Sequence, residues 1–258
     1  MKFGHALKIH AQNSPAEWGP FWLNYKLLKK KIKGITSAEK DHKPSPTTPE
    51  ALSSCQSEVE FFRLMDYEIR RSAQFLSLAE EQYVLRTRSV VDGYRTTLHL
   101  LQSPMLGLDR ALSPEATAEM WMRLMQACIS VYTELLLLNH WVVVSYCGFS
   151  KILKKHDRWT GFITKEKYLR GVVAKQHFAS FPKLDAMLKD MEALYLHIAK
   201  IVPDCPALSE GEVKMAAAKA IVASGALEFA KYTSELRRSI HESSTHSGSS
   251  FVGQGEEG

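Results

Sequence analysis

Apolar residues recur every three or four positions over two long stretches of the chain, a spacing typical of amphipathic helices. The first stretch runs from about residue 50 to 101 and ends where the segment LQSPMLGLDRALSPE breaks the pattern. The second begins at Pro114, directly after Ser113, because serine is a favoured N-cap and proline fits the first helical position. It continues to about residue 158, with apolar positions at Leu135, Leu138, Val142, Tyr146, Phe149 and Leu153. We therefore predict two long helices.

Shorter helices are predicted on both sides of this pair. One covers residues 2–10, and a second runs from residue 20 or 21 to Gly34, where glycine offers a C-terminal stop. The polar segment 36–49 contains three prolines and is predicted to be a loop. Three more helices are expected over 164–175, 181–200 and 209–240. Because no stretch alternates as a strand would, the predicted fold class is all-α: an antiparallel helical bundle with two long helices, an N-terminal helical hairpin and short C-terminal helices.

Composition narrows the class of protein. Hydrophobic residues make up 45% of the 258 residues, enough for a substantial core. The four cysteines form no CxxC pair, which argues against a zinc site or a disulfide scaffold and suits a reducing compartment. The N-terminal sequence MKFGHALKIHAQ has no long apolar region, and the most apolar run, 135–144, is too short to span a bilayer. We expect a soluble intracellular protein without a transmembrane segment or a metal.

Positive charge is concentrated near the N-terminus. Residues 1–40 contain eight lysines and two glutamates, a net charge of +6, whereas the whole chain carries +5. The remaining residues therefore carry a net charge of −1. Five of the lysines fall within residues 26–33. A local basic region of this kind suits an anion site or an anionic surface partner.

The lysines of the predicted helix ending at Gly34 lie on one side of it. At about 100° per residue, its apolar arc contains Phe21, Leu28, Ile32 and Ile35. The adjoining basic arc contains Lys26, Lys29, Lys30 and Lys33. Tyr25 lies where the two arcs meet. Like charges three or four positions apart cost about 0.2–0.5 kcal/mol per pair in a helix, so this arrangement carries a modest penalty.

A second basic stripe occurs at the end of the second long helix, on the side opposite its apolar residues. It contains Lys151, Lys154, Lys155 and Arg158. If the two stripes faced one groove, flexible lysine ammonium groups and the Tyr25 hydroxyl would suit a ligand with many phosphates. A lysine stripe on an amphipathic helix is more often simply its solvated face. The residues alone leave both interpretations open.

Other functional classes find less support. No glycine-rich phosphate loop, HExxH or GxSxG is present, and His156 is better explained by packing or capping than as a catalytic base. A nucleic-acid binder would use the same basic stripes, but no nucleic-acid motif appears. A phosphoinositide-binding membrane module would need a wide exposed apolar face, which the N-terminal helix lacks. We expect a non-enzymatic binding protein.

Four segments resemble the SPX domain in order and approximate spacing. They are MKFG at the start, EWGPFWLNYKLLKKKIK at 17–33, EFFRLMDYEI at 60–69 and GFSKILKKHDRWTG at 148–161. The resemblance covers about residues 1–200. SPX domains are helical sensors of inositol polyphosphates and pyrophosphates that report phosphate supply. The resemblance therefore implies an inositol polyphosphate ligand, no cofactor, and a stand-alone SPX domain protein that acts by binding.

The same resemblance assigns the site residues. The family's core phosphate-binding cluster falls on Tyr25, Lys29 and Lys155, and its neighbouring lysine surface on Lys151, Lys154 and Arg158. Additional contacts are expected from Lys2, Lys26, Lys30 and Lys33. Position 158 often holds lysine in the family, and arginine keeps the charge and adds bidentate phosphate contact. The family's usual PEW is AEW here, which leaves these residues intact.

These expectations give a domain plan and a set of partners. Residues 1–200 form the SPX-like domain, 201–240 an additional helical segment that braces the bundle or docks a partner, and 241–258 a disordered tail. The expected function is phosphate sensing through ligand-dependent binding of a protein such as a transcription factor or a phosphate-handling complex, in the cytoplasm or nucleus. A regulatory or scaffold subunit of a polyphosphate or phosphate-transport complex is the alternative.

Overall fold

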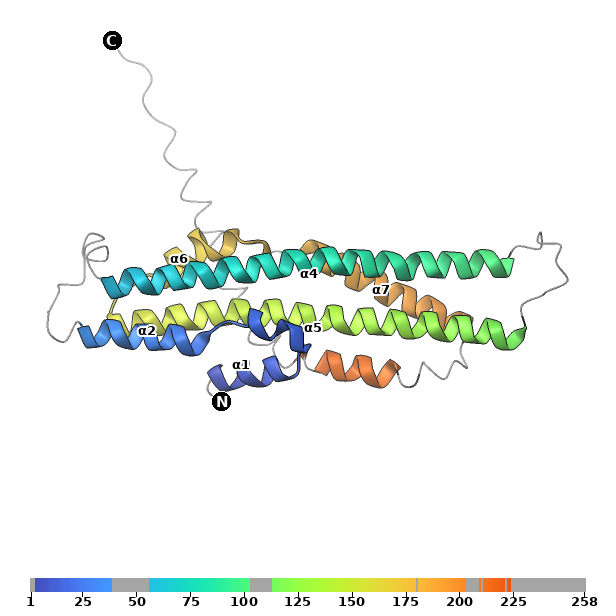
Figure 1. The fold of residues 1–258 in the computed structure, drawn as a ribbon, viewed down its shortest axis with the longest axis horizontal. Coiled ribbons are helices and arrows are strands. Elements are labelled where there is room, and N and C mark those ends of the chain that lie inside the picture. The colour runs from blue at the N-terminus through green and yellow to red at the C-terminus, as the bar shows by residue number, and fades with distance from the viewer. Residues whose placement is uncertain are drawn as a thin grey trace, which may run out of the picture.

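A computed structural model describes residues 3–38, 56–102, 113–179, 181–202, 209, 211–220 and 222–223. Every element in this part of the chain is helical, which confirms the predicted all-α fold class. Two 47-residue helices, α4 (Gln56–Gln102) and α5 (Pro114–Thr160), run antiparallel along the whole bundle (Figure 1). At 1.5 Å per residue each is about 70 Å long. The two predicted long helices are therefore confirmed.

Helix α5 is the central element. The Ser113 side chain caps its start by accepting a hydrogen bond from the Ala116 N–H, and Gly161 ends it with a left-handed φ of 80°. Helices α2, α4 and α7 pack around it, and its Trp141 and Phe149 are fully buried. By length and composition α5 could cross a membrane, but 67% of its most apolar window is buried inside the protein. That burial is the environment of a core helix.

The N-terminal region comprises α1 (Phe3–Gln12), the 3-10 turn η1 (Ala16–Phe21) and α2 (Tyr25–Ala38). The predicted start of the second helix, at residue 20 or 21, is wrong. Its first turn is fixed instead by Asn24, whose side-chain oxygen accepts a hydrogen bond from the Leu27 N–H at 3.1 Å. The predicted stop at Gly34 is also wrong, because this glycine is not among those with positive φ and the helix continues through it.

The C-terminal elements pack on the two long helices. The predicted helix 164–175 is divided into α6 (Lys165–Gly171) and the short 3-10 turn η2 (Val173–Lys175). A second 3-10 turn, η3 (His177–Ala179), precedes α7 (Pro182–Ile201), which packs against both α4 and α5. The predicted helix 181–200 corresponds closely to α7.

Residues 211–220 form a further helix against the bundle. Its Met215 and Ala218 are buried, and a Cβ at Gly211 would lie only 2.2 Å from Ile129 Cδ1 of α5. Lys219 also forms an ion pair with Glu192 of α7 at 3.2 Å. These contacts favour a brace over a free docking element for this part of the segment.

Several predictions fall wholly or partly outside the described residues. Residues 36–38 of the predicted loop belong to α2, and 39–49 are not described. The same holds for Lys2, most of the predicted helix 209–240 and the predicted tail 241–258. Cys128 and Cys147 are buried thiols, and no group of three metal-ligating side chains occurs among the residues that the structure describes.

Candidate functional site: a basic groove between three helices

A groove of about 690 Å³ lies where α1, the start of α2 and α5 meet. Four predicted site residues line it: Tyr25, Lys26, Lys29 and Lys155. The first three come from α2 and the fourth from α5, so residues about 130 positions apart in sequence share one surface. Helix α1 supplies the remaining wall, with His5 and Lys8 as its polar members. We call this the basic groove.

Lys29 of the α2 stripe and Lys155 of the α5 stripe share the basic groove. Burial lowers the pKa of the Lys155 ammonium, and the charges of Lys29, Arg158 and Lys33 lower it further. Lys29 and Lys33 belong to α2, so the electrostatic contact bridges the two helices. A cation surrounded by other cations is destabilised in its charged form, and an anion placed among them reverses that effect.

Aromatic rings hold two of the α5 lysines in place. The Lys155 Nζ lies 4.4 Å from the centre of the Trp159 ring, and the Lys151 Nζ lies 4.7 Å from the centre of the Phe3 ring of α1. Such cation–π contacts contribute about 0.5–2 kcal/mol each. They restrict the positions of both side chains. Lys151 therefore also links α1 to α5.

Tyr25 keeps its proton at neutral pH. Burial raises the pKa of its phenol, so the hydroxyl can donate a hydrogen bond. Its ring packs against Phe3 with the ring centres 5.1 Å apart. A Cβ at Gly4 would lie 3.4 Å from Tyr25 Cδ1, an ordinary van der Waals contact, so α1 packs directly on this ring. The tyrosine is thus fixed between α1 and α2.

A second hollow of about 420 Å³ adjoins the basic groove along α2. Lys26 and Lys29 line both, and Lys30 and Lys33 line only the second. The remaining predicted residues, Lys151, Lys154 and Arg158, line neither hollow. Lys154 and Arg158 are exposed on the neighbouring surface of α5.

His5 and Lys8 are polar lining residues that the sequence did not single out. Lys8 contributes to the positive charge of residues 1–40, but no contact was predicted for it. The spacing of three positions would have placed both on one face of α1. The sequence does not show which face of so short a helix packs on the bundle. The spacing of His5 and Lys8 therefore could not predict that they line the groove.

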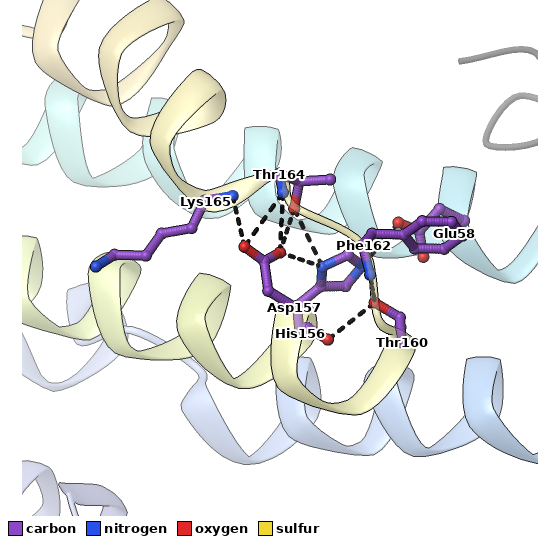
Figure 2. A network of polar contacts seen from close by, with 7 residues as sticks. All are labelled: Glu58, His156, Asp157, Thr160, Phe162, Thr164 and Lys165. Carbon is purple, nitrogen blue, oxygen red and sulfur yellow. Dashed lines mark hydrogen bonds and ion pairs between the residues drawn. The ribbon is translucent and has the colours of Figure 1, made fainter. Parts of the chain in front are cut away.

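A buried polar network fixes the end of α5 that carries the basic stripe (Figure 2). His156 is fully buried, with its Nε2 2.7 Å from Glu58 Oε1 of α4 and its Nδ1 3.1 Å from Asp157 Oδ1. Burial acts to lower the His156 pKa, but the hydrogen bonds and charges of the two carboxylates outweigh it and raise the pKa. The imidazolium form donates to both acids. His156 is thus a packing residue, as predicted.

Asp157 extends this network to α6. It accepts hydrogen bonds from the backbone N–H groups of Thr164 and Lys165, at 3.1 and 2.9 Å, and from the Thr164 hydroxyl at 2.6 Å. Burial alone would raise the pKa of Asp157, but these hydrogen bonds and that of His156 lower it. The start of α4, the end of α5 and the start of α6 are therefore tied together behind Lys155.

A second buried acid of α4 positions the start of α2. Glu68 is 2% exposed and accepts a hydrogen bond from the Asn24 backbone N–H at 3.1 Å. Its ion-pair partner Arg71 donates to the Trp22 carbonyl at 3.0 Å. Both contacts hold the turn that precedes Tyr25. The orientation of this tyrosine is thereby set from the opposite helix.

Comparisons with known proteins agree with this architecture. The family model for the SPX domain matches residues 1–59, which contain α1, α2 and their lysines. Residues 1–59 are therefore similar to SPX domains. This confirms the family resemblance predicted from its motifs.

The curated relatives are SPX domain-containing proteins. SPX domain-containing protein 5 of Oryza sativa subsp. indica is 28% identical over 221 residues, which is 86% of this chain and 76% of that protein. SPX domain-containing protein 1 of Arabidopsis thaliana is 26% identical over 75% of this chain and 70% of its own length. SPX domain-containing protein 3 of Oryza sativa subsp. japonica reaches 31% identity over 75% of this chain and 63% of its own length.

A solved structure has the same fold. It is the SPX domain of Chaetomium thermophilum glycerophosphodiester phosphodiesterase 1, in complex with inositol hexakisphosphate. It is 26% identical to this chain, with a TM-score of 0.58, and the match covers 77% of this chain and 99% of the other. The SPX-like bundle is thus confirmed.

Proposed function

We propose that this SPX-like domain binds an inositol polyphosphate or pyrophosphate in the basic groove. One observation carries the proposal: Lys29 of α2 and Lys155 of α5 share the groove, and their charges act on one another. Tyr25 adds a neutral hydroxyl donor beside them. The inositol hexakisphosphate bound to the Chaetomium thermophilum SPX domain supports the same class of ligand here.

The chemistry of the ligand matches that of the groove. A ring bearing six phosphates spreads its negative charge over all sides, and the groove offers cations from two helices. Lysine ammonium groups donate up to three hydrogen bonds and adapt to different phosphate positions. Because these cations are largely solvent-exposed, the affinity should fall as ionic strength rises and the screening length shortens below about 10 Å.

The contacts fall into two groups in this proposal. Tyr25, Lys29 and Lys155 form the centre of the site, and Lys26 lies beside them. The outer group extends the positive field along both helices and consists of Lys30, Lys33, Lys151, Lys154 and Arg158. Lys2 is a further proposed contact, and His5 and Lys8 of α1 line the groove.

The proposed role is non-catalytic sensing of phosphate supply. Ligand occupancy would change the charge of the α1, α2 and α5 surface from basic to acidic, and a protein partner would read that change. A transcription factor or a phosphate-handling complex in the cytoplasm or nucleus is the proposed partner class. The names of the relatives, which are SPX domain-containing proteins, support a binding role rather than catalysis.

The test is calorimetric titration of the full chain with inositol hexakisphosphate and with a pyrophosphorylated analogue, each at low and high salt. Lys29→Ala and Lys155→Ala should each weaken binding, and the matched surface variant Lys189→Ala on α7 should not. Equal affinity for a DNA duplex would favour the nucleic-acid alternative, and preference for phosphoinositide vesicles the membrane alternative. No binding of inositol hexakisphosphate by the wild-type chain at low salt would refute the proposal.

A further inference from the structure

The outward side of α4 carries an apolar stripe that no described element of the bundle covers. Tyr67, Leu78 and Leu85 are 58%, 57% and 65% exposed. They are 11 and 7 positions apart, so at about 100° per residue they lie within about 20° of one line. The stripe is about 27 Å long at 1.5 Å per residue.

This stripe plays no part in packing α4 onto the bundle. The buried residues of α4 lie on the opposite side of the helix and include Phe61, Met65, Ile69, Leu76 and Tyr83. Scattered exposed apolar side chains are ordinary on protein surfaces, but a line of three points to a contact surface. In Figure 1, α4 and α1 lie on opposite sides of α5. The stripe is thus remote from the basic groove.

Arginines follow one flank of the stripe. Arg63, Arg70, Arg88 and Arg95 all lie about 40–90° from the apolar line on the same side of α4. Acidic residues on this flank are fewer: Glu81 is exposed, and Asp92 already pairs with Arg95 at 3.2 Å. The flank therefore carries a net positive charge beside apolar side chains.

A groove of about 410 Å³ between α4 and α7 continues this surface. Its lining includes three cations, Arg88, Arg95 and Lys183, and two acids, Asp92 and Asp190, beside the apolar Val91 and Met187. Since Asp92 already pairs with Arg95, the lining keeps a net positive charge of one. Thr87 also lines it, and its buried hydroxyl oxygen has no hydrogen-bond partner among the described residues. The surface is therefore hollowed beside Arg88 and Arg95.

We propose that this surface, which we call the α4 face (Tyr67, Leu78 and Leu85 with the flank Arg63, Arg70, Arg88 and Arg95), docks an acidic amphipathic helix of a partner protein. A straight apolar line of about 27 Å matches the side of a second helix packed along α4. Glutamates or aspartates beside the partner's apolar side chains would pair with the four arginines. Recognition of one helix by another through such anchors is a common mode of peptide binding.

A second copy of this chain fits the α4 face poorly. If two α4 helices packed antiparallel, the arginine flank of one would meet the arginine flank of the other. If they packed parallel, it would meet the flank of Arg71, Gln82 and Ser89, which offers no acid. The charge thus favours an acidic partner over self-association. The inference rests on the proposed function only in requiring a protein partner, since the polyphosphate ligand has no role at this face.

The test uses two synthetic amphipathic peptides with identical leucine positions, one with glutamates and one with lysines on its flank. Binding of each to the full chain is followed by fluorescence anisotropy. The acidic peptide should bind at least about tenfold more tightly, which corresponds to about 1.4 kcal/mol. The double variant Leu78→Gln/Leu85→Gln should lose that binding. The matched double variant Leu196→Gln/Val213→Gln, exposed elsewhere on the surface, should retain it.

Further arms separate the possible outcomes. Arg63→Glu/Arg70→Glu should reverse the preference toward the basic peptide. Equal binding of the two peptides, or an unchanged affinity in the Leu78→Gln/Leu85→Gln variant, overturns the proposal. Calorimetry with inositol hexakisphosphate on that same variant should match the wild type. Loss of peptide binding with intact polyphosphate binding therefore tests the α4 face apart from the proposed function.

A photo-crosslinking phenylalanine analogue in place of Tyr67 tests the other occupants. In the purified full chain, a crosslink to a second copy, or to residues 224–258 of the same chain, would show that the protein covers this face itself. Either result overturns the proposal. With the acidic peptide added, a crosslink to the peptide is the expected result.

Discussion

Replacing Glu58 by glutamine tests whether the buried network behind Lys155 stabilises the bundle. Glu58 is 2% exposed, and one of its oxygens lies 2.7 Å from His156 Nε2. Removing one partner of a buried ion pair costs about 3–5 kcal/mol. The other Glu58 oxygen is buried and has no hydrogen-bond partner among the described side chains and backbone, so a glutamine NH₂ placed there would be unsatisfied too. We expect a loss of about 3 kcal/mol, because glutamine retains one acceptor for the imidazole.

Glu60→Gln is the matched control, two positions along the same helix. Glu60 pairs with Lys31 at 2.8 Å, and both side chains are more than 40% exposed. A surface pair of this kind contributes about 0–1 kcal/mol. Urea unfolding followed by circular dichroism should therefore separate the two variants clearly. Equal free energies of unfolding for Glu58→Gln and Glu60→Gln would refute the role assigned to the network.

The stability difference between the wild type and Glu58→Gln should also depend on pH. The His156 pKa is raised in the folded protein, so its contribution is fully present below the unfolded value of about 6.5 and is lost as pH rises through the higher folded value. The stability difference between wild type and Glu58→Gln should therefore shrink between about pH 6 and about pH 9. An identical difference at both pH values would mean that His156 is not held as the imidazolium.

Three shorter predictions concern other parts of the structure. Tyr25→Phe removes one hydroxyl donor and should weaken inositol hexakisphosphate binding by about 1.5 kcal/mol in calorimetry, with unchanged thermal stability. Gly148→Ala places a Cβ 2.6 Å from Leu23 Cδ2 and should lower the free energy of unfolding by about 1–3 kcal/mol, whereas Gly19→Ala, with nothing within 4 Å, should not. Burial raises the pKa of the Cys128 thiol to about 12, so iodoacetamide should modify it only after denaturation, as peptide mass spectrometry would show.

The long helices could be predicted because their pattern repeats over many turns. The ends of α2 could not be predicted, because they depend on hydrogen bonds and backbone angles at Asn24 and Gly34 that the sequence pattern does not reveal. Asn24 caps the helix while Glu68 of α4 binds its N–H, and Gly34 continues the helix without a left-handed φ. The local sequence predicted that the helix starts near Pro20 and ends at Gly34. In the structure it runs from Tyr25 to Ala38.

The candidate site could also be predicted only in part. Helical spacing predicted that Lys29 and Lys155 each belong to a basic stripe. Whether the two stripes come together depends on how α2 packs on α5, which only the resemblance suggested. The structure places Lys29 and Lys155 in one groove. The burial of the acids Glu58 and Glu68 could not be predicted. The pattern of apolar positions does not reveal which charged side chains form ion pairs in the core.

The central claim is that Lys29 and Lys155 bind one ligand together. A double-mutant cycle measured by calorimetry with inositol hexakisphosphate tests it, using Lys29→Ala, Lys155→Ala and the double variant. We expect the two losses of binding free energy to be non-additive by about 0.5–3 kcal/mol, because each lysine both contacts the ligand and repels the other. Strict additivity, or no loss in either single variant, would mean that the two stripes do not form one polyphosphate site.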